Sequence, residues 1–312
     1  MNDSRSKNSS ELTGNRLVLH KNDSAYPNAF RVIPKPPDSL YIIGNPEALE
    51  EGLSVVGARR ATPYGRTCTE KFAAMAAKRG VCIISGGALG CDSIAHKTAL
   101  ANGAKTVVFL GGGCDQVYPA GNFKLFQQVI DCGGAVVSEH DWQMPALPYQ
   151  FRSRNRLIAA LGRATLIVEA GLPSGTFTTA DYAIEAGREV LVVPGSIASP
   201  HSQGANRLLY QGAIPVVDEQ SFDDILDSLF GMFELRQPDC NVRKRQAFSP
   251  LIEAVLACPM SLEQMYEFMA KSSRAKHSLT DLMPEIYMEI NKYEKMGVIA
   301  RYPSGQYGPA VG

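Results

Sequence analysis

Short runs of apolar, β-branched residues recur through the middle of the chain, separated by longer segments with helical periodicity. The strand-length runs are Leu53–Val56, Val81–Ser85, Thr106–Leu110, Ala135–Ser138, Thr165–Glu169, Glu189–Val193 and Ile214–Val217. Helical segments such as Arg66–Arg79 and Asp92–Asn102 lie between most of them. Strands that are apolar throughout and alternate with helices are typical of a parallel sheet covered on both faces. The sequence therefore predicts an α/β domain, Rossmann-like and doubly wound with a mostly parallel sheet, over residues 38–232.

The residues on either side of this domain differ in character. Residues 1–37 are predicted to be a disordered tail and an extended, proline-marked lead-in, because the first residues are almost all polar. Residues 218–239 carry seven acids against one base, and the basic run Arg243–Arg245 follows at once. This separation of charge predicts an interdomain linker, which we assign to residues 233–247.

Residues 248–312 are predicted to form a second, smaller domain. Three segments have apolar residues at helical spacing, and a strand–turn–strand pattern closes the chain. The helical segments are Pro250–Cys258, Ser261–Ala270 and Met283–Met296, and the strand–turn–strand pattern covers Gly297–Tyr307. Three short helices followed by a strand–turn–strand favour a winged-helix-like domain, with a generic helical cap as the alternative.

Composition excludes several classes of protein. Lys plus Arg and Asp plus Glu both number 31, so the formal net charge is zero and the chain is not globally basic. The N-terminus lacks an apolar h-region and the longest apolar stretches are strand-length, which argues against a secretory signal or a membrane span. The seven cysteines include no CxxC pair, which argues against a zinc site or a disulfide framework. We interpret the chain as cytoplasmic, with no metal, cofactor or membrane partner.

Several of the predicted strands end in glycine, at the edge where sheets of this kind bind ligands. No GxxxxGK[ST] motif is present, and the run that begins at Gly111 fails the GxGxxG pattern at Gln116. Two glycine-rich turns remain: Ser85–Gly90, with Asp92 as a candidate N-cap, and Ser174–Thr176. Turns that open onto helix N-termini present unpaired N–H groups to an anion, although tight turns without a ligand are the alternative. The candidate phosphate-binding residues are Gly86, Gly87, Ser174, Gly175 and Thr176.

Basic residues concentrate beside these turns. Six of them fall in and after the first strand-to-helix turn: Arg59, Arg60, Arg66, Lys71, Lys78 and Arg79. The run Phe151–Arg156 places an aromatic residue, three arginines and Asn155 within six positions. Arginine suits phosphate oxygens, and an aromatic face can stack on a base. The pattern predicts a local anion groove, with a solvated helix face and ordinary ion pairs as the alternative.

Motifs for catalysis are few, and no catalytic residue is expected. The chain has no GxSxG motif. His96 follows Asp92 by four residues and is either a base oriented by that carboxylate or, as we favour, a structural histidine. Glu139 and Glu169 each end a predicted strand, where they can act as a general acid or base or as anchors for arginines.

The motifs together resemble one known family, the DNA-processing protein A family, also called DprA or Smf. The resemblance covers about residues 36–218. Its matching segments are Val55–Arg59 (VGxR), Ser85–His96 (SGxAxGIDxxAH, with Cys91 for the usual Ile), Tyr118–Asn122 (YPxxN), Ser138–Glu139 (SE), Phe151–Arg156 (FPxRNR, with Arg152 where Pro is common), Glu169–Ala170, Ser174–Ala180, Gly187–Arg188 and Pro194–Gly195.

The resemblance implies binding of single-stranded DNA, a homodimer formed through the Rossmann-like domain, and loading of the recombinase RecA in natural transformation. It implies that Arg59 contacts phosphate and that Phe151 stacks on a base. Arg154, Asn155 and Arg156 would hold or contact the DNA backbone. Ala120 stands where some members carry Lys, and Lys124, one helical turn on, is the expected substitute.

Two other functions compete with this one. The first is a nucleotide-binding enzyme, an N-glycosidic hydrolase similar to lysine decarboxylase-like proteins, which carry a PGGxGTxxE stretch. Thr179 stands here where that stretch has Glu, which argues against hydrolysis. The second is a sensor of a small nucleotide that contacts a partner through its C-terminal domain.

Overall fold

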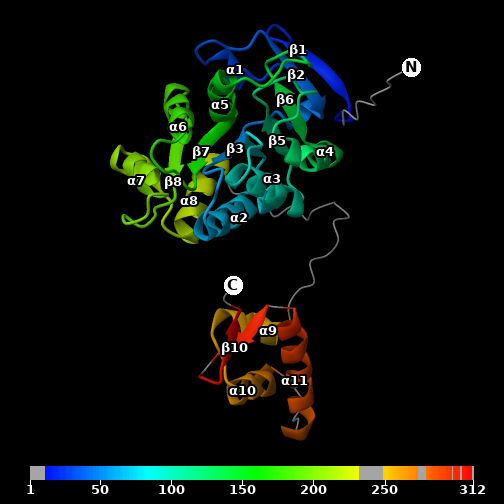
Figure 1. Ribbon diagram of the computed structural model, residues 1–312, viewed down its shortest axis with the longest axis vertical. Helices are drawn as coiled ribbons and strands as arrows, with labels where there is room; N and C mark the ends of the chain where they lie inside the picture. Colours follow the sequence, from blue (N-terminus) through cyan, green and yellow to red (C-terminus); the bar gives the residue numbers. More distant parts are fainter. Residues whose placement is uncertain (1–10, 232–248, 273–278, 297, 303, 311–312) are drawn as a thin grey trace, which may run out of the picture. The chain divides into compact units, whose positions relative to one another are not determined.

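The structure is a computed structural model, and it describes residues 11–231, 249–272, 279–296, 298–302 and 304–310 (Figure 1). The chain divides into two compact units, residues 1–242 and 243–312. Each unit is described separately below. The predicted linker, residues 233–247, lies outside the described residues.

The first unit is built on a nine-stranded sheet with the order β1-β2-β6-β5-β4-β3-β7-β8-β9. Strands β2 to β9 include the predicted alternation, and the seven from β3 onward pair in parallel. Strand β2 runs antiparallel to β6, and β1 runs antiparallel to β2. The strands are β1 (Arg16–His20), β2 (Ser39–Gly44), β3 (Gly52–Val56), β4 (Ile83–Ser85), β5 (Thr106–Phe109), β6 (Ala135–Ser138), β7 (Gly162–Ile167), β8 (Glu189–Val192) and β9 (Ile214–Pro215).

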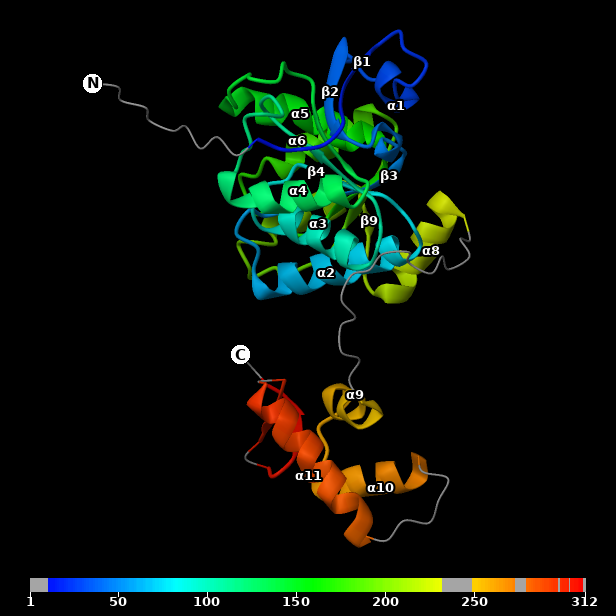
Figure 2. The ribbon, with the colours of Figure 1, turned by 90° about the vertical axis from the view of Figure 1, so that its right-hand side faces the viewer.

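Helices cover both faces of this sheet, as the apolar strands require. Figure 2 shows α5 and α6 on one side of the sheet and α2 and α3 on the other. One face carries α1 (Asn28–Arg31), α5 (Pro148–Leu161), α6 (Thr176–Glu185) and α7 (Gln203–Tyr210). The other carries α2 (Pro63–Lys78), α3 (Cys91–Ala101), α4 (Phe123–Asp131) and α8 (Glu219–Phe230). The short 3₁₀ turns are η1 (Pro46–Ala48) and η2 (Ala120–Asn122). The predicted doubly wound α/β fold is confirmed.

The chain reverses its direction of travel across the sheet between β3 and β7. From β3 it proceeds outward through β4, β5 and β6, and α5 then carries it back to β7 on the other side of β3. In open α/β sheets, ligands bind in the crevice outside the carboxyl ends of the strands at such a reversal. The loops that follow β3 and β7 therefore form the walls of the candidate site.

The prediction of a disordered tail and lead-in over residues 1–37 is wrong for residues 11–37. Strand β1 pairs along its full length with β2, and α1 buries Phe30 completely against the sheet. Leu19 of β1 joins the same core. The segment is polar on average, so its few apolar side chains did not indicate a strand. Pairing with β2 is what places them in the core. Residues 1–10 lie outside the described residues.

The acidic stretch after residue 218 begins as a helix, which corrects its interpretation as linker over residues 219–230. Asp218 caps α8 by accepting the N–H of Ser221 at 2.7 Å. Asp223 and Asp227 both pair with Arg79 of α2, at 2.8 and 2.5 Å. Phe222 and Leu226 are fully buried on the opposite side of the helix. The acids therefore form the solvated face of an amphipathic helix.

The second unit contains three helices followed by an antiparallel strand pair, in the order predicted for a winged-helix-like domain. Its elements are α9 (Pro250–Ala257), α10 (Leu262–Ser272), α11 (Leu279–Lys295), β10 (Ile299–Arg301) and β11 (Tyr307–Pro309). Ile252, Met265 and Ile286, one from each helix, are fully buried in its own small core. The sequence offers Lys271, Arg274 and Lys276 as contacts for duplex DNA, with a solvated loop as the alternative; residues 273–278 lie outside the described residues. In the described part of the chain, no helix combines the length and apolar character needed to cross a bilayer.

Candidate nucleic-acid interface

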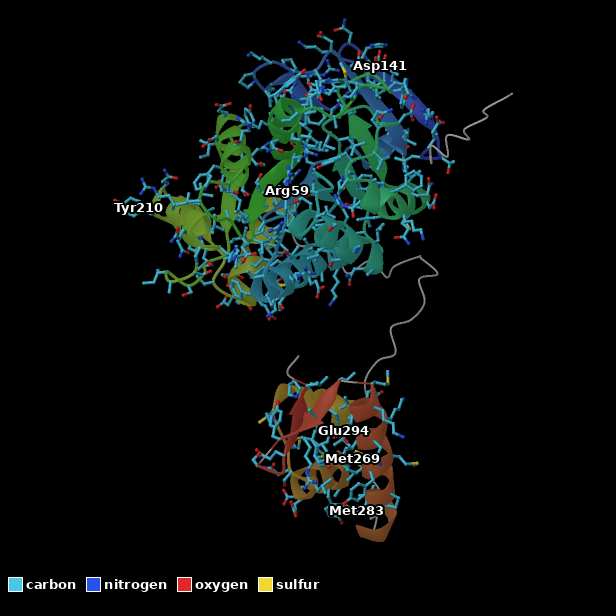
Figure 3. The ribbon with its side chains drawn as sticks, viewed as in Figure 1. Arg59, Asp141, Tyr210, Met269, Met283 and Glu294 are labelled. Carbon is cyan, nitrogen blue, oxygen red and sulfur yellow. The ribbon has the colours of Figure 1, made fainter. Side chains whose placement is uncertain are left out.

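A groove of about 570 Å³ opens at the carboxyl edge of the sheet, where the chain reverses direction. Most of its lining comes from the loop after β3, the loop after β7 with the start of α6, and the first turns of α5, and the segments after β4 and β5 add Ala88, Asp92 and Tyr118. Figure 3 shows Arg59, from the first of these loops, in the middle of the unit near α3. The groove is lined by Val56, Gly57, Ala58, Arg59, Ala88, Asp92, Tyr118, Pro148, Phe151, Arg152, Arg154, Asn155, Ile158, Gly171, Pro173, Ser174, Gly175, Thr176 and Thr179.

A smaller pocket of about 60 Å³ adjoins the groove. Arg59, Phe151 and Arg154 line both spaces, so these side chains lie along the boundary between them. The remaining lining of the small pocket is Gly86, Ala88, Leu89, Tyr118 and Pro119. The predicted candidates Arg59, Gly86, Phe151, Arg154, Asn155, Ser174, Gly175 and Thr176 are thereby brought together.

The first glycine loop, Ser85–Gly90, is closed by a carboxylate of the protein itself. Asp92 accepts the N–H of Gly86 at 3.1 Å and the N–H of Ala88 at 3.3 Å. The N-cap of α3 is Gly90, whose φ of 81° suits glycine, and Asp92 lies in the first turn instead of at the predicted cap. These N–H groups are therefore not free for a bound anion.

Arg154 holds the same loop from the other side. Its guanidinium donates to the carbonyl of Gly86 at 2.8 Å and to the carbonyl of Phe109, and the residue is only 5% exposed. Burial lowers the pKa of Arg154 to about 10, an effect that the nearby Asp92 carboxylate opposes. Arg154 remains charged at neutral pH, and its Nη1 is bonded to carbonyls of the protein. It holds the first glycine loop, and its contact with the DNA backbone stays a prediction.

The second glycine loop, Ser174–Thr176, is open. Gly175 is the N-cap of α6 and has no side chain with which to cap it, so the only side chain that bonds the first helical N–H among the described residues is that of Ser174. The Ser174 hydroxyl donates to Thr176 Oγ1 at 2.8 Å and accepts the Thr176 N–H at 3.2 Å. A methyl group built on Gly175 would meet no atom within 4 Å. A helix N-terminus of this kind, edged with hydroxyls and facing open space, can accept a phosphate.

Two arginines that line the groove, Arg59 and Arg152, have no carboxylate partner among the described residues, whereas other basic residues form ion pairs. Within the described part of the chain, neither Arg59 nor Arg152 forms an ion pair, and both are exposed. Lys71 and Arg79, which share the same basic run in the sequence, are paired with acids of α8. The prediction of ordinary ion pairs thus holds for the far end of α2. Of that basic run, Arg59 is the residue that lines the groove.

Phe151 lies beneath other side chains at the boundary of the two spaces. The Arg59 guanidinium lies 5.9 Å from its ring centroid, and the Tyr118 ring lies 5.3 Å away at an interplanar angle of 58°. A methyl built on Gly111 would be 2.8 Å from the ring, so backbone packs closely against it as well. The ring is half-buried and has neighbours on several sides.

Three candidates are not among the residues that line the groove or the small pocket: Gly87, Lys124 and Arg156. Arg156 forms a two-pronged ion pair with Glu139, at 2.7 and 2.6 Å, and its Nε donates to the carbonyl of Lys35. It fastens the N-terminal segment to α5. Gly87 packs against Phe126, and Lys124 is exposed on α4.

The acids and the histidine considered for catalysis have structural partners. Glu169 accepts the N–H of Thr62 at 2.9 Å and its hydroxyl proton at 2.7 Å, which holds the start of α2. His96 is fully buried and bonds Thr106 Oγ1 through Nδ1 at 2.7 Å. Burial, with a smaller effect of Arg154, lowers the pKa of His96 to about 3, so it is neutral. Among the described residues, no three His, Cys, Asp or Glu side chains are arranged to hold a metal ion.

The family model for DNA recombination-mediator protein A matches residues 17–230 of the chain. This chain belongs to that family. The resemblance drawn from the motifs is thereby confirmed, and the match begins in β1, within the segment expected to be a tail.

Known members of the family are similar over different shares of the chain. Protein Smf of Escherichia coli strain K12 is 34% identical over 93% of this chain and 77% of its own length. A putative DNA processing protein DprA of Mycobacterium tuberculosis is 40% identical over 61% of this chain, which spans about half (48%) of that relative. The solved DNA processing protein A of Helicobacter pylori, described by its single-stranded DNA binding mode, is 30% identical with a TM-score of 0.63. It covers 69% of this chain and 98% of its own.

Sequence reasoning did not select four DprA residues that the structure places at or beside the groove. Tyr118, Arg152 and Thr179 line the groove, and Asn122 donates from Nδ2 to the carbonyl of Gly87 at 2.8 Å. Tyr118 and Asn122 were quoted only as part of a motif. Arg152 was counted among the three arginines of the Phe151–Arg156 run but was not selected as a site residue, and Thr179 was considered only against the hydrolase stretch. A signal was present in each case, but spacing alone does not show which side of a turn faces a ligand.

Proposed function

We propose that this DprA protein binds single-stranded DNA in the groove between β3 and β7 and acts there as a recombination mediator. One observation carries the proposal: Arg59 and Arg152, both exposed and without an acidic partner among the described residues, lie in one groove with the N-terminus of α6. The net charge of the chain is zero, so this concentration of unpaired positive charge is local. The Helicobacter pylori protein described by its single-stranded DNA binding supports the same ligand.

The groove suits a strand whose bases are not paired. Phosphates meet guanidinium groups and the start of α6, while aromatic rings at the boundary meet the face of a base. A base within a duplex stacks on its neighbours and does not present that face. Stacking on rings tolerates any base, so we expect binding with little sequence preference.

The partners proposed for this activity are RecA and a second copy of the chain. Both follow from family membership, which also supports a role in natural transformation or in other homologous recombination. Loading RecA requires that the bound strand be handed to the recombinase. No enzymatic step is part of the proposal, because Asp92, Glu139 and Glu169 are each bonded to groups of the protein.

The test is fluorescence anisotropy of a labelled oligo-dT at several salt concentrations, with a blunt duplex as competitor. Replacing Arg59 or Arg152 by alanine should flatten the log–log salt dependence by about one unit each, because each removes one phosphate contact. Lys71→Ala is the matched control, since Lys71 is an exposed base paired with Glu219 at 2.6 Å on α2. That variant should bind as the wild type does.

Three outcomes would contradict the proposal. If duplex DNA competes as well as single-stranded DNA, the groove is not specific for single strands. Equal salt slopes for the wild type and both groove variants would remove the groove as the site. Saturable micromolar binding of a free mononucleotide, without preference for longer strands, would support the nucleotide sensor or the enzyme instead.

A further inference from the structure

We infer that a strand bound in the groove continues along the valley between α5 and α6 to a second nucleotide subsite at Lys35 and Tyr182. The inference rests on the proposed function and adds to it a contact outside the groove. Three features support it: a cavity on the same two helices, an unpaired lysine held at its edge, and an aromatic ring in its wall.

The cavity has a volume of about 280 Å³ and lies between the N-terminal segment, α5 and α6. Its walls come from residues 33–35, from Ser153 and Arg156 of α5 and from Tyr182 and Glu185 of α6, none of which lines the groove. Small-molecule sites span about 300–1,000 Å³. The cavity is at the lower end of that range, so it suits one base and not a longer segment.

The groove and the cavity occupy successive turns of the same two helices, which pack side by side (Figures 1 and 2). On α5, Arg152 lines the groove and Arg156, four residues on, lines the cavity. On α6, Thr179 lines the groove and Tyr182, three residues on, lines the cavity. Residues at these spacings share one helix face, with Cβ atoms about 5–6 Å apart. A strand that leaves the groove past Arg152 therefore reaches this cavity next.

Lys35 is held at the edge of the cavity in a backbone conformation that non-glycine residues rarely adopt. Its φ is 58°, and no other non-glycine residue in the described part of the chain has a positive φ. Prolines precede and follow it, and Arg156 Nε donates to its carbonyl at 3.2 Å. Residues held in this way cluster at ligand-binding positions. Lys35 is exposed and forms no ion pair among the described residues, so its charge is available to a phosphate.

A third cavity, of about 440 Å³, lies on the other side of Lys35 and does not suit a phosphate. Lys35 and Arg156 line it as well, but Asp38, Glu139 and Asp141 add three acids to its wall. The charge of Arg156 is offset there by its ion pair with Glu139. A phosphate at Lys35 is therefore repelled from this side and placed toward α6.

Tyr182 supplies the face on which the base of that nucleotide stacks. Its ring is half-buried, packs against the core of the first unit on one side and lines the cavity. Glu185, one helical turn on, is the only acid among the lining residues of this cavity. Its carboxylate repels a further phosphate, so the path accepts one nucleotide beyond the groove and ends there.

The experiment is an anisotropy titration with an oligo-dT ladder from about 4 to about 16 nucleotides, the range of single-strand sites on one fold. The wild type should gain affinity at the length that first reaches Lys35. Lys35→Gln, which removes the charge and keeps an unbranched stem, should lack that gain and lower the log–log salt slope by about one unit on longer strands only. Tyr182→Leu should weaken the same longer strands by about 5- to 150-fold, and Tyr182→Phe should retain their affinity.

Lys78→Gln is the matched control. Lys78 is an exposed lysine at the end of α2 that forms no ion pair among the described residues and lines neither the groove nor the cavity. This variant should follow the wild type at every length.

The ladder separates this inference from the function on which it rests. If the wild type binds oligo-dT at no length, the proposed function fails and the inference fails with it. If the wild type binds and Lys35→Gln and Tyr182→Leu match it at all lengths, the groove stands and the second subsite is wrong. Equal losses on the shortest and longest strands, or a loss in only one of the two variants, would also overturn the inference, because a nucleotide at this position needs both contacts.

Discussion

The two glycine-rich turns of this DprA protein look alike in sequence and differ in the folded chain. The turn Ser85–Gly90 has its N–H groups bonded to Asp92 and its Gly86 carbonyl bonded to Arg154. The turn Ser174–Thr176 has no side-chain cap on the helix that it begins, and open space lies beside Gly175. In the second turn Ser174 also takes N–H groups, those of Thr176 and Phe177, but the space beside Gly175 stays open, whereas the first turn is filled by Asp92 and Arg154.

The comparison shows that glycine content does not by itself make an anion site. A backbone N–H binds a phosphate only when no other acceptor has reached it, and buried N–H groups are nearly always paired. In the first turn Asp92 takes the place that an anion would occupy. The turn then serves as a rigid base for its neighbours, among them Tyr118 by way of Asn122.

The largest expected difference in stability is between substitutions at two adjacent residues of α5, each of which bonds one of the two turns. Arg154 bonds the first turn from a buried position, and Asn155 reaches the carbonyl of Gly175 in the second at 3.5 Å from a more open one. Arg154→Met should lower the free energy of unfolding by about 3–5 kcal/mol, because Asp92 would be left buried without its cation. Asn155→Ala should cost within about 0.5 kcal/mol.

Urea denaturation measures this difference when it is followed by the fluorescence of Trp142, the single tryptophan, which lies in the first unit. Equal losses for Arg154→Met and Asn155→Ala would show that the first turn is not supported by the buried guanidinium of Arg154.

Adding one methyl group to each turn gives the next largest contrast. In Gly86→Ala the new methyl would lie 2.7 Å from both terminal nitrogens of Arg154, which cannot move without losing its bonds. We expect a cost of about 1–3 kcal/mol from this overpacking. Gly175 has a φ of −66° and free space around it, so Gly175→Ala should change the free energy of unfolding by about 0.5 kcal/mol or less.

Thermal denaturation of the two alanine variants beside the wild type checks this contrast. A Gly86→Ala protein as stable as the wild type would mean that Arg154 has room to shift and that the first turn is less rigid than its contacts indicate.

The smallest expected effect concerns pH and the helix behind the first turn. The pKa of His96 falls to about 3 in the fold from an ordinary value of 6.5, so the folded protein excludes a proton that the unfolded chain binds. Stability from this group is complete above pH 6.5 and declines as the pH falls toward 3. Between pH 6 and pH 5 the wild type should lose about 1 kcal/mol more than His96→Gln.

Urea midpoints at the two pH values report this difference, and the other titrating groups cancel between the two proteins. Parallel pH dependence in wild type and variant would mean that His96 accepts a proton in the folded state, contrary to its burial beside Arg154.

Much of the fold could be predicted from the sequence, because burial on both faces of a parallel sheet leaves a local pattern. Strand β6 begins and ends at the predicted residues, Ala135 and Ser138. Strand β7 begins earlier than predicted and ends at Ile167, since the chain turns toward the site at Glu169. Strand β1 was not predicted, because its pairing with β2 depends on backbone hydrogen bonds, which the residue types do not indicate.

The sequence predicted which residues form the candidate site better than it predicted the hydrogen-bond and ion-pair partners of those residues. Arg59, Phe151, Arg154 and Thr176 were selected and do line the groove. Glu139 was predicted as an anchor for an arginine, and it does pair with Arg156; the sequence did not indicate that Arg154 bonds the carbonyl groups of Gly86 and Phe109. The partner of a buried arginine depends on which acid or carbonyl group lies next to it in the folded chain. The separation of two residues in the sequence does not give their distance in the fold.

By itself, the sequence determined the alternation of strands and helices, the edge of the sheet at which the groove opens, and membership of the family. Only the tertiary structure decided which of two similar glycine turns stays open, which arginines keep their charge for a ligand, and which ring faces solvent. The physical reason is that propensity and periodicity act between near neighbours, whereas pairing and exposure are settled by atoms that folding brings from distant parts of the chain.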